Sequence, residues 1–181
     1  VLHELVAAGA PEEILWEAKP HIGTDRLPRI MTNVRQTILS SGGEFLFDSC
    51  VTELIVKDNR VKGVVCGDRR IEAAAVVLAT GHSARDIYEL LYSSGIAVEA
   101  KPFAMGVRIE HRQTMVDTAQ YGMVNPVLPP ADYKLVQHLD DGSVYTFCMC
   151  PGGYVVAAAS EDGVVTNGMS YADREGENAN A

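Results

Sequence analysis

The sequence has 181 residues, of which 47% are hydrophobic and 22% charged, and its formal net charge is −9 at pH 7. This composition is near the globular average and excludes a disordered chain, a collagen and a disulfide scaffold. The acidic charge excludes nucleic acid as an expected partner, because the few basic residues do not cluster. No run approaches the roughly 18 apolar residues of a membrane span, so no membrane partner is expected either.

The chain begins at Val1 without a basic-then-apolar leader, which predicts a cytoplasmic location. The starting Val and the polar end at Ala181 suggest a fragment of a longer protein.

The four cysteines of the chain lack the spacing of a zinc site or a thioredoxin-type site. They are predicted to be buried free thiols in a reducing compartment, and they are Cys50, Cys66, Cys148 and Cys150. The last two share one face of a predicted strand. The histidines show no metal-binding spacing, so no metal is expected.

The first elements are predicted to be helical. Pro11 is suited to open a second short helix after a break at Gly9. Thr24 is a predicted N-cap for a helix over 24–41, and a short strand is expected over 44–47.

A β-hairpin follows, with strands over 51–56 and 61–66 joined by the turn residues 57–60. Residues 71–74 lead into 76–80, a run that is apolar on both faces, as in a strand buried within a parallel sheet. Gly81 ends this run, and Ser83 with Asp86 resembles a capping box for a helix that Gly95 closes.

The second part of the chain is mostly strand. Alternating residues predict a strand over 103–110, and a short helix around Val116 is expected to end at Gly122. Four further strands at short spacing predict one antiparallel meander, over 133–139, 143–150, 154–160 and 164–171. Residues after Tyr171 are polar and predicted to be exposed or frayed.

The clearest chemical signal is the run from Val76 to Gly81. Ligands of open α/β sheets bind at the carboxyl edge of the strands, and Gly there permits close approach to the backbone. The order of elements over 24–86 resembles the middle of two-dinucleotide-fold flavoproteins of the glutathione reductase type. That resemblance implies that Cys50 and Val51 contact the adenine end of FAD, and that Thr80 and Gly81 form a second cofactor-side turn. His82 directly follows this edge and is a further cofactor-side candidate.

Three motifs extend the resemblance: KPFAMGVRIEH at 101–111, FCMCPGG at 147–153 and NGMSY at 167–171. Their order is similar to that of uncharacterised bacterial FAD-dependent dehydrogenases, often labelled NAD(FAD)-utilising dehydrogenases. This resemblance implies FAD in the intact parent, with NAD or NADP as electron donor or acceptor. The chain departs from the family in having no G-x-G-x-x-G turn for the pyrophosphate. We therefore expect a middle piece that does not hold FAD tightly alone.

Several residues are substrate-side candidates, each with a structural alternative. Arg108 is a contact for an anionic substrate or the flavin, or it pairs with Glu110 on a solvated strand. His111 is a proton donor near the flavin or a structural histidine, and the same alternatives apply to His21. Cys150 is a redox thiol or a packed one, and the sequence indicates no cationic neighbour that would activate it.

Two glycine motifs complete the candidates. Gly152 and Gly153 permit close approach of a flat group, either the isoalloxazine ring or the substrate, or they form a simple turn between strands. Asn167, before Gly168, is by itself a turn signal, and only the family resemblance makes it a substrate contact.

The predicted fold class is α+β, with a partial FAD-binding α/β layer and β-hairpin over 1–96 and a mostly antiparallel substrate-side sheet over 97–181. The predicted function is part of an FAD-dependent oxidoreductase acting on an unidentified small molecule. The alternatives are a non-enzymatic interaction module, which binds a partner by strand addition, and a redox-inactive flavin-fold sensor. Dimerisation through the exposed cut surface is also expected.

Overall fold

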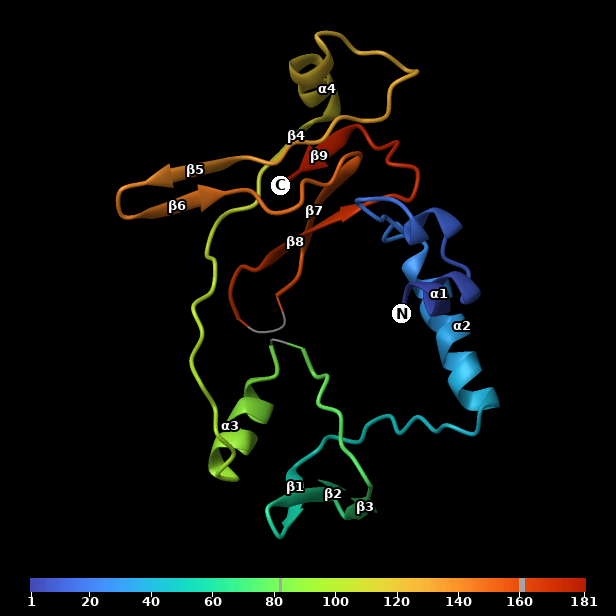
Figure 1. The fold of residues 1–181 in the computed structure, drawn as a ribbon, viewed down its shortest axis with the longest axis vertical. Coiled ribbons are helices and arrows are strands. Elements are labelled where there is room, and N and C mark those ends of the chain that lie inside the picture. The colour runs from blue at the N-terminus through green and yellow to red at the C-terminus, as the bar shows by residue number, and fades with distance from the viewer. Residues whose placement is uncertain (82, 160–161) are drawn as a thin grey trace. The chain divides into compact units, whose positions relative to one another are not determined.

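The structure, a computed structural model, describes residues 1–81, 83–159 and 162–181 (Figure 1). It is an α+β fold, as predicted from the sequence. The chain forms two compact units: unit 1 comprises Val1–Gly43 with Gly106–Ala181, and unit 2 comprises Glu44–Met105. The division near residue 97 that the sequence suggests concerns the domains of the intact protein and stays a prediction.

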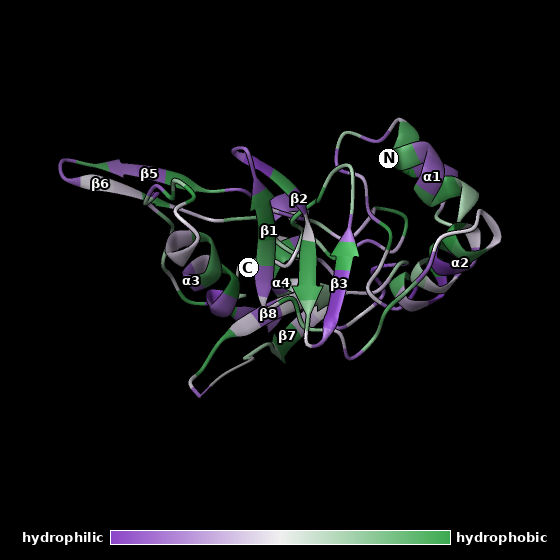
Figure 2. Cartoon of the chain, turned by 90° about the horizontal axis from the view of Figure 1, so that it is seen from below, coloured by the Kyte–Doolittle hydropathy of each residue, from purple (hydrophilic) through white to green (hydrophobic). Residues whose placement is uncertain are grey.

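Unit 1 opens with three short helices, which are α1 (Leu2–Ala7), the 3₁₀ helix η1 (Glu12–Leu15) and α2 (Leu27–Ser40). Pro11 is the residue just before η1, with a φ of −63°, so its predicted role at a helix start is confirmed. The helices bury a small apolar cluster made of Ala8, Ala10, Ile14 and Ile30. The exposed positions of α2 are polar in part, which gives the mixed colouring along that helix in Figure 2.

The predicted N-cap at Thr24 is wrong, because α2 begins three residues later, after Arg26. The Thr24 amide instead donates to the Ser170 carbonyl at 2.9 Å. Beside it, an Asp25 carboxylate oxygen accepts from the Ala172 amide, also at 2.9 Å. Long-range hydrogen bonds to the end of the chain thus hold residues 24–25 in place of a local cap.

Unit 2 contains a three-stranded antiparallel sheet of β1 (Glu53–Lys57), β2 (Arg60–Cys66) and β3 (Arg69–Glu72) in that order. This confirms the hairpin. Asp58 and Asn59 form its two-residue turn with φ of 51° and 59°, as a type I′ turn requires. Helix α3 (Arg85–Ser93) closes with Gly95 at a φ of 72°, as predicted. Its N-cap residue is Ala84 rather than the predicted Ser83.

Two strands predicted in unit 2 do not form. Residues 44–47 have no strand structure, nor does the run 76–80. In that run the side chain of Val77 is 88% exposed. A strand that is apolar on both faces needs strands at both edges and layers on both faces, and no described segment pairs with this run. All strand pairs in the described ranges are antiparallel, so the partial α/β layer with a parallel strand is not observed.

The remainder of unit 1 carries one helix and six strands within the described residues. In chain order these are β4 (Glu110–Arg112), α4 (Gln113–Tyr121), β5 (Val136–Leu139), β6 (Gly142–Tyr145), β7 (Gly153–Ala157), β8 (Thr166–Ser170) and β9 (Asn178–Asn180). Helix α4 ends at Gly122 as predicted, with a φ of 77°. The predicted strand over 103–110 is wrong for most of its length, because only Glu110 enters β4 and residues 103–108 have no strand structure. Ile109 continues the pairing with β9 by exchanging two backbone hydrogen bonds with Ala181, both at 2.9 Å.

The predicted single meander is also wrong. Residues 133–171 form two separate hairpins, β5–β6 and β7–β8, and β9 pairs with β4 (Figure 1). The single meander does not form because the tail that was predicted to fray takes part in the fold. Its residues Ala179 and Asn180 are fully buried. Strand β9 lies between β4 and Cys150, which forms an isolated bridge with Asn180. A second apolar cluster therefore forms around this strand, from Val116, Ala131, Met149 and Ala179.

Candidate functional site

Strand β9 brings together the substrate-side residues that lie far apart in the sequence. The Arg108 guanidinium donates from Nη1 to Asn180 Oδ1 at 2.9 Å. Asn180 in turn donates from Nδ2 to the Met169 carbonyl at 3.3 Å. Its backbone exchanges two hydrogen bonds with Cys150, at 2.7 and 3.2 Å. Arg108 and Cys150 are thus held on the same buried asparagine, which the sequence analysis did not single out.

Gly168 in β8 makes room for this arrangement. A Cβ at this position would overlap both Asn180 Oδ1 and Arg108 Nη1. Its neighbour Asn167 pairs with Val156 within the β7–β8 hairpin, so the motif lies in a strand, as predicted over 164–171, and not in a turn. The Asn167 side chain accepts from the Gly168 amide at 2.9 Å and is exposed. The motif therefore combines one solvent-facing amide with one position at which only glycine fits.

Arg108 does not pair with Glu110, so that alternative is wrong. Both Glu110 oxygens are used elsewhere: Oε2 accepts from the Val155 amide at 2.7 Å, and Oε1 accepts from Asn178 Nδ2 at 3.1 Å. The carboxylate thereby ties β4 to β7 and β9. The positive charge of Arg108 is left without a salt-bridge partner within the described part of the chain.

His111 lies against Tyr133 at the second apolar cluster. Its Nε2 and the Tyr133 hydroxyl are 2.9 Å apart in a hydrogen bond, and the two ring centroids are 5.7 Å apart. Its Nδ1 is buried and has no hydrogen-bond partner among the described residues. Burial raises the pKa of Tyr133, which keeps its hydroxyl protonated near neutral pH. The other candidate, His21, is hydrogen-bonded to backbone instead: its Nε2 lies 2.7 Å from the Tyr171 carbonyl oxygen.

Cys150 has two cationic neighbours that the sequence analysis missed. Burial raises the pKa of its thiol, and the nearby Cys148 thiol raises it further, whereas the Arg108 and Arg174 guanidiniums lower it. All four cysteines are free, as expected. The prediction that they are buried is wrong: Cys50 and Cys148 are exposed, and the other two are half-buried.

The glycines after Cys150 pack against the chain itself. A Cβ on Gly152 would overlap the Arg174 carbonyl, and one on Gly153 would overlap the Met169 carbonyl. Gly152, at a φ of 64°, also donates its amide to Gln113 Oε1 at 3.1 Å. The space that these glycines free is therefore filled by backbone from β8 and the segment before β9.

The cofactor-side candidates all lie in unit 2. Cys50 and Thr80 are exposed and Val51 is half-buried, while His82 lies outside the described residues. Gly81 has a φ of 81°, and a Cβ there would meet no atom within 4 Å. This backbone is open to a ligand, which fits a contact with one edge of FAD. Within the described residues no glycine-rich turn leads into a helix, so they fit an edge contact but not a pyrophosphate cradle.

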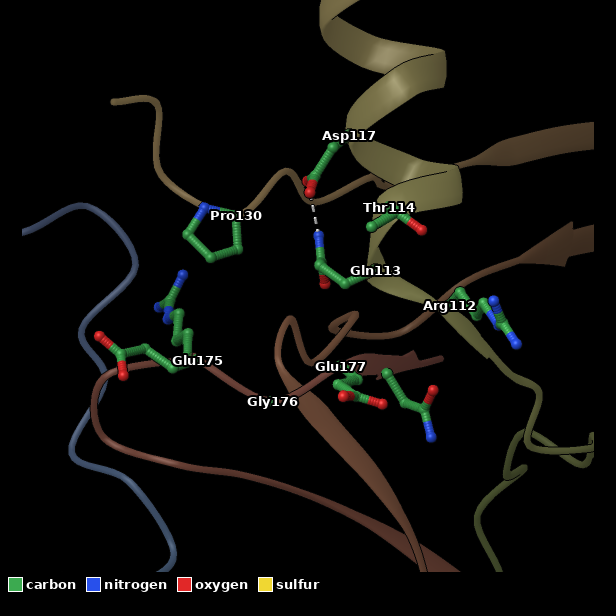
Figure 3. A pocket seen from close by; sticks show the side chains of 10 residues that line it. Arg112, Gln113, Thr114, Asp117, Pro130, Glu175, Gly176 and Glu177 are labelled. Atoms are coloured by element: carbon green, nitrogen blue, oxygen red, sulfur yellow. Dashed lines mark hydrogen bonds between the residues drawn. The ribbon is translucent and has the colours of Figure 1, made fainter. Parts of the chain in front are cut away.

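A pocket of about 490 Å³ opens at the start of α4 (Figure 3). None of the predicted site residues lines it, although Gly152 is hydrogen-bonded to Gln113 in its wall. Gln113 forms its floor and is bonded through Nε2 to Asp117 and to the Ala131 carbonyl, at 2.9 and 2.8 Å. Its rim carries both charge signs, from Arg112, Arg174, Glu175 and Glu177. Sequence reasoning missed this pocket because its walls come from α4 and from the tail that was predicted to fray.

The described ranges also bear on metal binding and on membrane insertion. No cluster of three or more metal-ligating side chains occurs there. No helix in those ranges is long and apolar enough to cross a membrane.

Comparison with known sequences shows two similarities. The family described as "FAD-dependent protein, C-terminal domain-like" matches residues 102–181. An uncharacterised protein of Clostridium beijerinckii is 48% identical over 186 residues and aligns with the whole chain. The chain spans 35% of that relative's length. The chain is thus similar to FAD-dependent proteins over a segment that contains Arg108, His111, Cys150, Gly152, Gly153 and Asn167 but not His21.

Proposed function

We propose that this chain is part of an FAD-dependent oxidoreductase whose substrate is an unidentified small molecule. The observation that carries the proposal is the family match over residues 102–181, which encloses the group formed by Arg108, Cys150 and Asn180. In such enzymes the flavin supplies hydride transfer, while the protein orients the substrate and adjusts the electrostatics of the ring.

The chain's own contribution follows from its polar groups. Arg108 uses Nη1 to bind Asn180, which leaves its other N–H groups to bind an anionic substrate or the flavin edge. In unit 2, the open backbone at Thr80 and Gly81 is proposed to contact the cofactor, with Cys50 and Val51 at its adenine end. NAD or NADP is the proposed electron partner. The four free thiols support a cytoplasmic location, because disulfides are rare in reducing compartments.

A second candidate is a non-enzymatic interaction module. The segment before β4 favours it, because the side chains of Phe103, Met105 and Val107 are more than four-fifths exposed, at 81%, 87% and 86%. Exposed apolar side chains on an extended segment are suited to binding by strand addition. A redox-inactive flavin-fold sensor is distinguished from both by binding FAD without being reduced by NADH or NADPH.

The test is a flavin measurement on two proteins, this chain and the longer C. beijerinckii relative, purified without added cofactor. We expect flavin absorption bands from the relative alone, release of FAD on denaturation, and bleaching of the bands with NADH or NADPH under anaerobic conditions. Bands that bleach with dithionite but with neither nucleotide would favour the sensor. A relative that carries no flavin, even after incubation with FAD, would contradict the oxidoreductase and favour the interaction module.

A further inference from the structure

The segment Cys148-Met149-Cys150 carries two thiols two residues apart. Met149 is buried in the second apolar cluster, and both cysteines that flank it are less buried than it is. Cys148 is exposed and Cys150 is half-buried, and neither is in a disulfide. The Cys148 thiol is close enough to Cys150 to raise the pKa of the Cys150 thiol. One thiol is therefore accessible to solvent, with the second directly behind it.

The backbone fixes one of these thiols and leaves the other adjustable. Cys150 is held by two hydrogen bonds to Asn180, whereas residues 146–149 lie outside any regular strand. Two residues of fully extended chain span about 6.6–7.2 Å between Cα atoms, which lies around the upper disulfide limit of about 6.8 Å and above the most common spacing of about 5.5–6 Å. A bond between the two thiols therefore requires the irregular segment to contract. Strained disulfides of this kind are readily reduced, as redox-active rather than structural disulfides are.

The surroundings of Cys150 carry positive charge. Arg108 is bonded to Asn180, the residue that bridges Cys150, and the Arg174 backbone packs against Gly152, two residues further on. Both guanidiniums lower the pKa of the Cys150 thiol, but burial and the Cys148 thiol outweigh them, so the pKa stays raised. The positive charge beside Cys150 favours an anionic partner for the dithiol.

We propose that Cys148 and Cys150 form a redox-active dithiol that is oxidised by anionic small-molecule disulfides, with Cys148 as the attacking thiol and Cys150 as the resolving thiol. The Cys148 thiolate attacks one sulfur of the small disulfide, forms a mixed disulfide and releases one thiol. Cys150, as its thiolate, then attacks Cys148 Sγ and expels the second thiol. The protein loses two hydrogens and the small disulfide becomes two thiols, so atoms and electrons balance without a flavin.

The experiment uses glutathione disulfide and the intact chain in which Cys50 and Cys66 are replaced by serine. Mass spectrometry is expected to find a loss of two hydrogens without a retained glutathione, and peptide mapping to locate the bond within residues 148–150. Cys150→Ser is expected to stop at one glutathione on Cys148. Cys148→Ser is expected to react about tenfold more slowly, because only the half-buried thiol remains.

Arg108→Gln tests the role of the charge, with the exposed Arg60→Gln as its matched control. We expect the first substitution to slow release of glutathione from the mixed disulfide several-fold and the second to leave it unchanged. Stable glutathione adducts on both thiols of the Cys50→Ser/Cys66→Ser protein would overturn the proposal, as would equal rates for the two single serine variants. Peptide mapping of the unsubstituted chain checks the same bond without dependence on any variant. None of these readouts contains flavin, so the outcome is separate from that of the proposed function.

Discussion

The β1–β2–β3 sheet of unit 2 and the β4–β9 pair of unit 1 are both antiparallel, but they are assembled from different kinds of contact. In the first, neighbouring strands follow one another in the chain, and a two-residue turn joins Lys57 to Arg60. In the second, Glu110 pairs with Asn180 across 70 residues (180 minus 110). The first sheet is specified by its turns, while the second depends on side chains that fit only when distant segments meet.

The two sheets also differ in burial. In the three-stranded sheet Ile55 is the buried large side chain, and much of the rest faces solvent. Strand β9 has only three residues, yet Ala179 and Asn180 are both fully buried. Substitutions are therefore expected to be costly at β9 and around it, and nearly neutral in the hairpin.

The largest effect is expected from Ala179→Asp. This change buries a carboxylate with no partner in the second apolar cluster, so we expect a loss of about 3–5 kcal/mol in the free energy of unfolding, measured by urea denaturation. Ala157→Asp, at an exposed position of β7, is the matched control and should cost less than about 0.5 kcal/mol. Equal effects from the two would mean that β9 is not part of the core.

Gly153→Ala should cost somewhat less, about 2–3 kcal/mol. The added methyl group would overlap the Met169 carbonyl, and backbone on both sides must shift to admit it. Gly142→Ala provides the comparison, because a Cβ there meets nothing within 4 Å. Thermal unfolding followed by circular dichroism measures both variants, and an unchanged midpoint for Gly153→Ala would contradict the close contact between β7 and β8.

A smaller loss, about 1–2 kcal/mol, is predicted for Tyr133→Phe. Removal of the hydroxyl leaves His111 Nε2 without its partner, next to an Nδ1 that already has none within the described residues. The exposed Tyr145→Phe should change stability little. The pair can be compared by chemical denaturation, and a Tyr133→Phe protein as stable as the parent would mean that His111 bonds elsewhere.

The smallest effect is expected in the hairpin, and it has the opposite sign. Asn59 has a φ of 59°, which glycine adopts at lower cost, so Asn59→Gly should stabilise unit 2 by about 0.5 kcal/mol. Hydrogen exchange of the β1 and β2 amides measures this locally. Faster exchange in the variant would show that the turn is not of the type assigned.

The outcome of the sequence predictions follows the same division. Features set by neighbouring residues were predicted well: the start of η1 after Pro11, the turn at Asp58 and Asn59, and the helix ends at Gly95 and Gly122. Each depends on backbone conformations that only a few residue types favour.

Features set by distant residues were missed. The polar tail looked frayed because nothing in it has a strand or core pattern, yet Asn178 and Asn180 are bonded by the side chains of Glu110 and Arg108. The converse error occurred at Val77, which has the composition of a buried strand but no partner in the described chain. For the candidate site, the sequence identified Arg108 and Cys150 but not the asparagine that joins them.

The long separation between β4 and β9 has a consequence for synthesis of the protein. At about 5–20 residues per second, a ribosome needs roughly 4–14 seconds to progress from residue 110 to residue 180. During that interval β4 has no partner, and Met149 and Val116 lack the strand that completes their cluster. The hairpin of unit 2 can close long before this. The nascent chain therefore carries an open strand edge until the Asn180 codon has been read, which makes that interval the period of greatest exposure to aggregation and to chaperones.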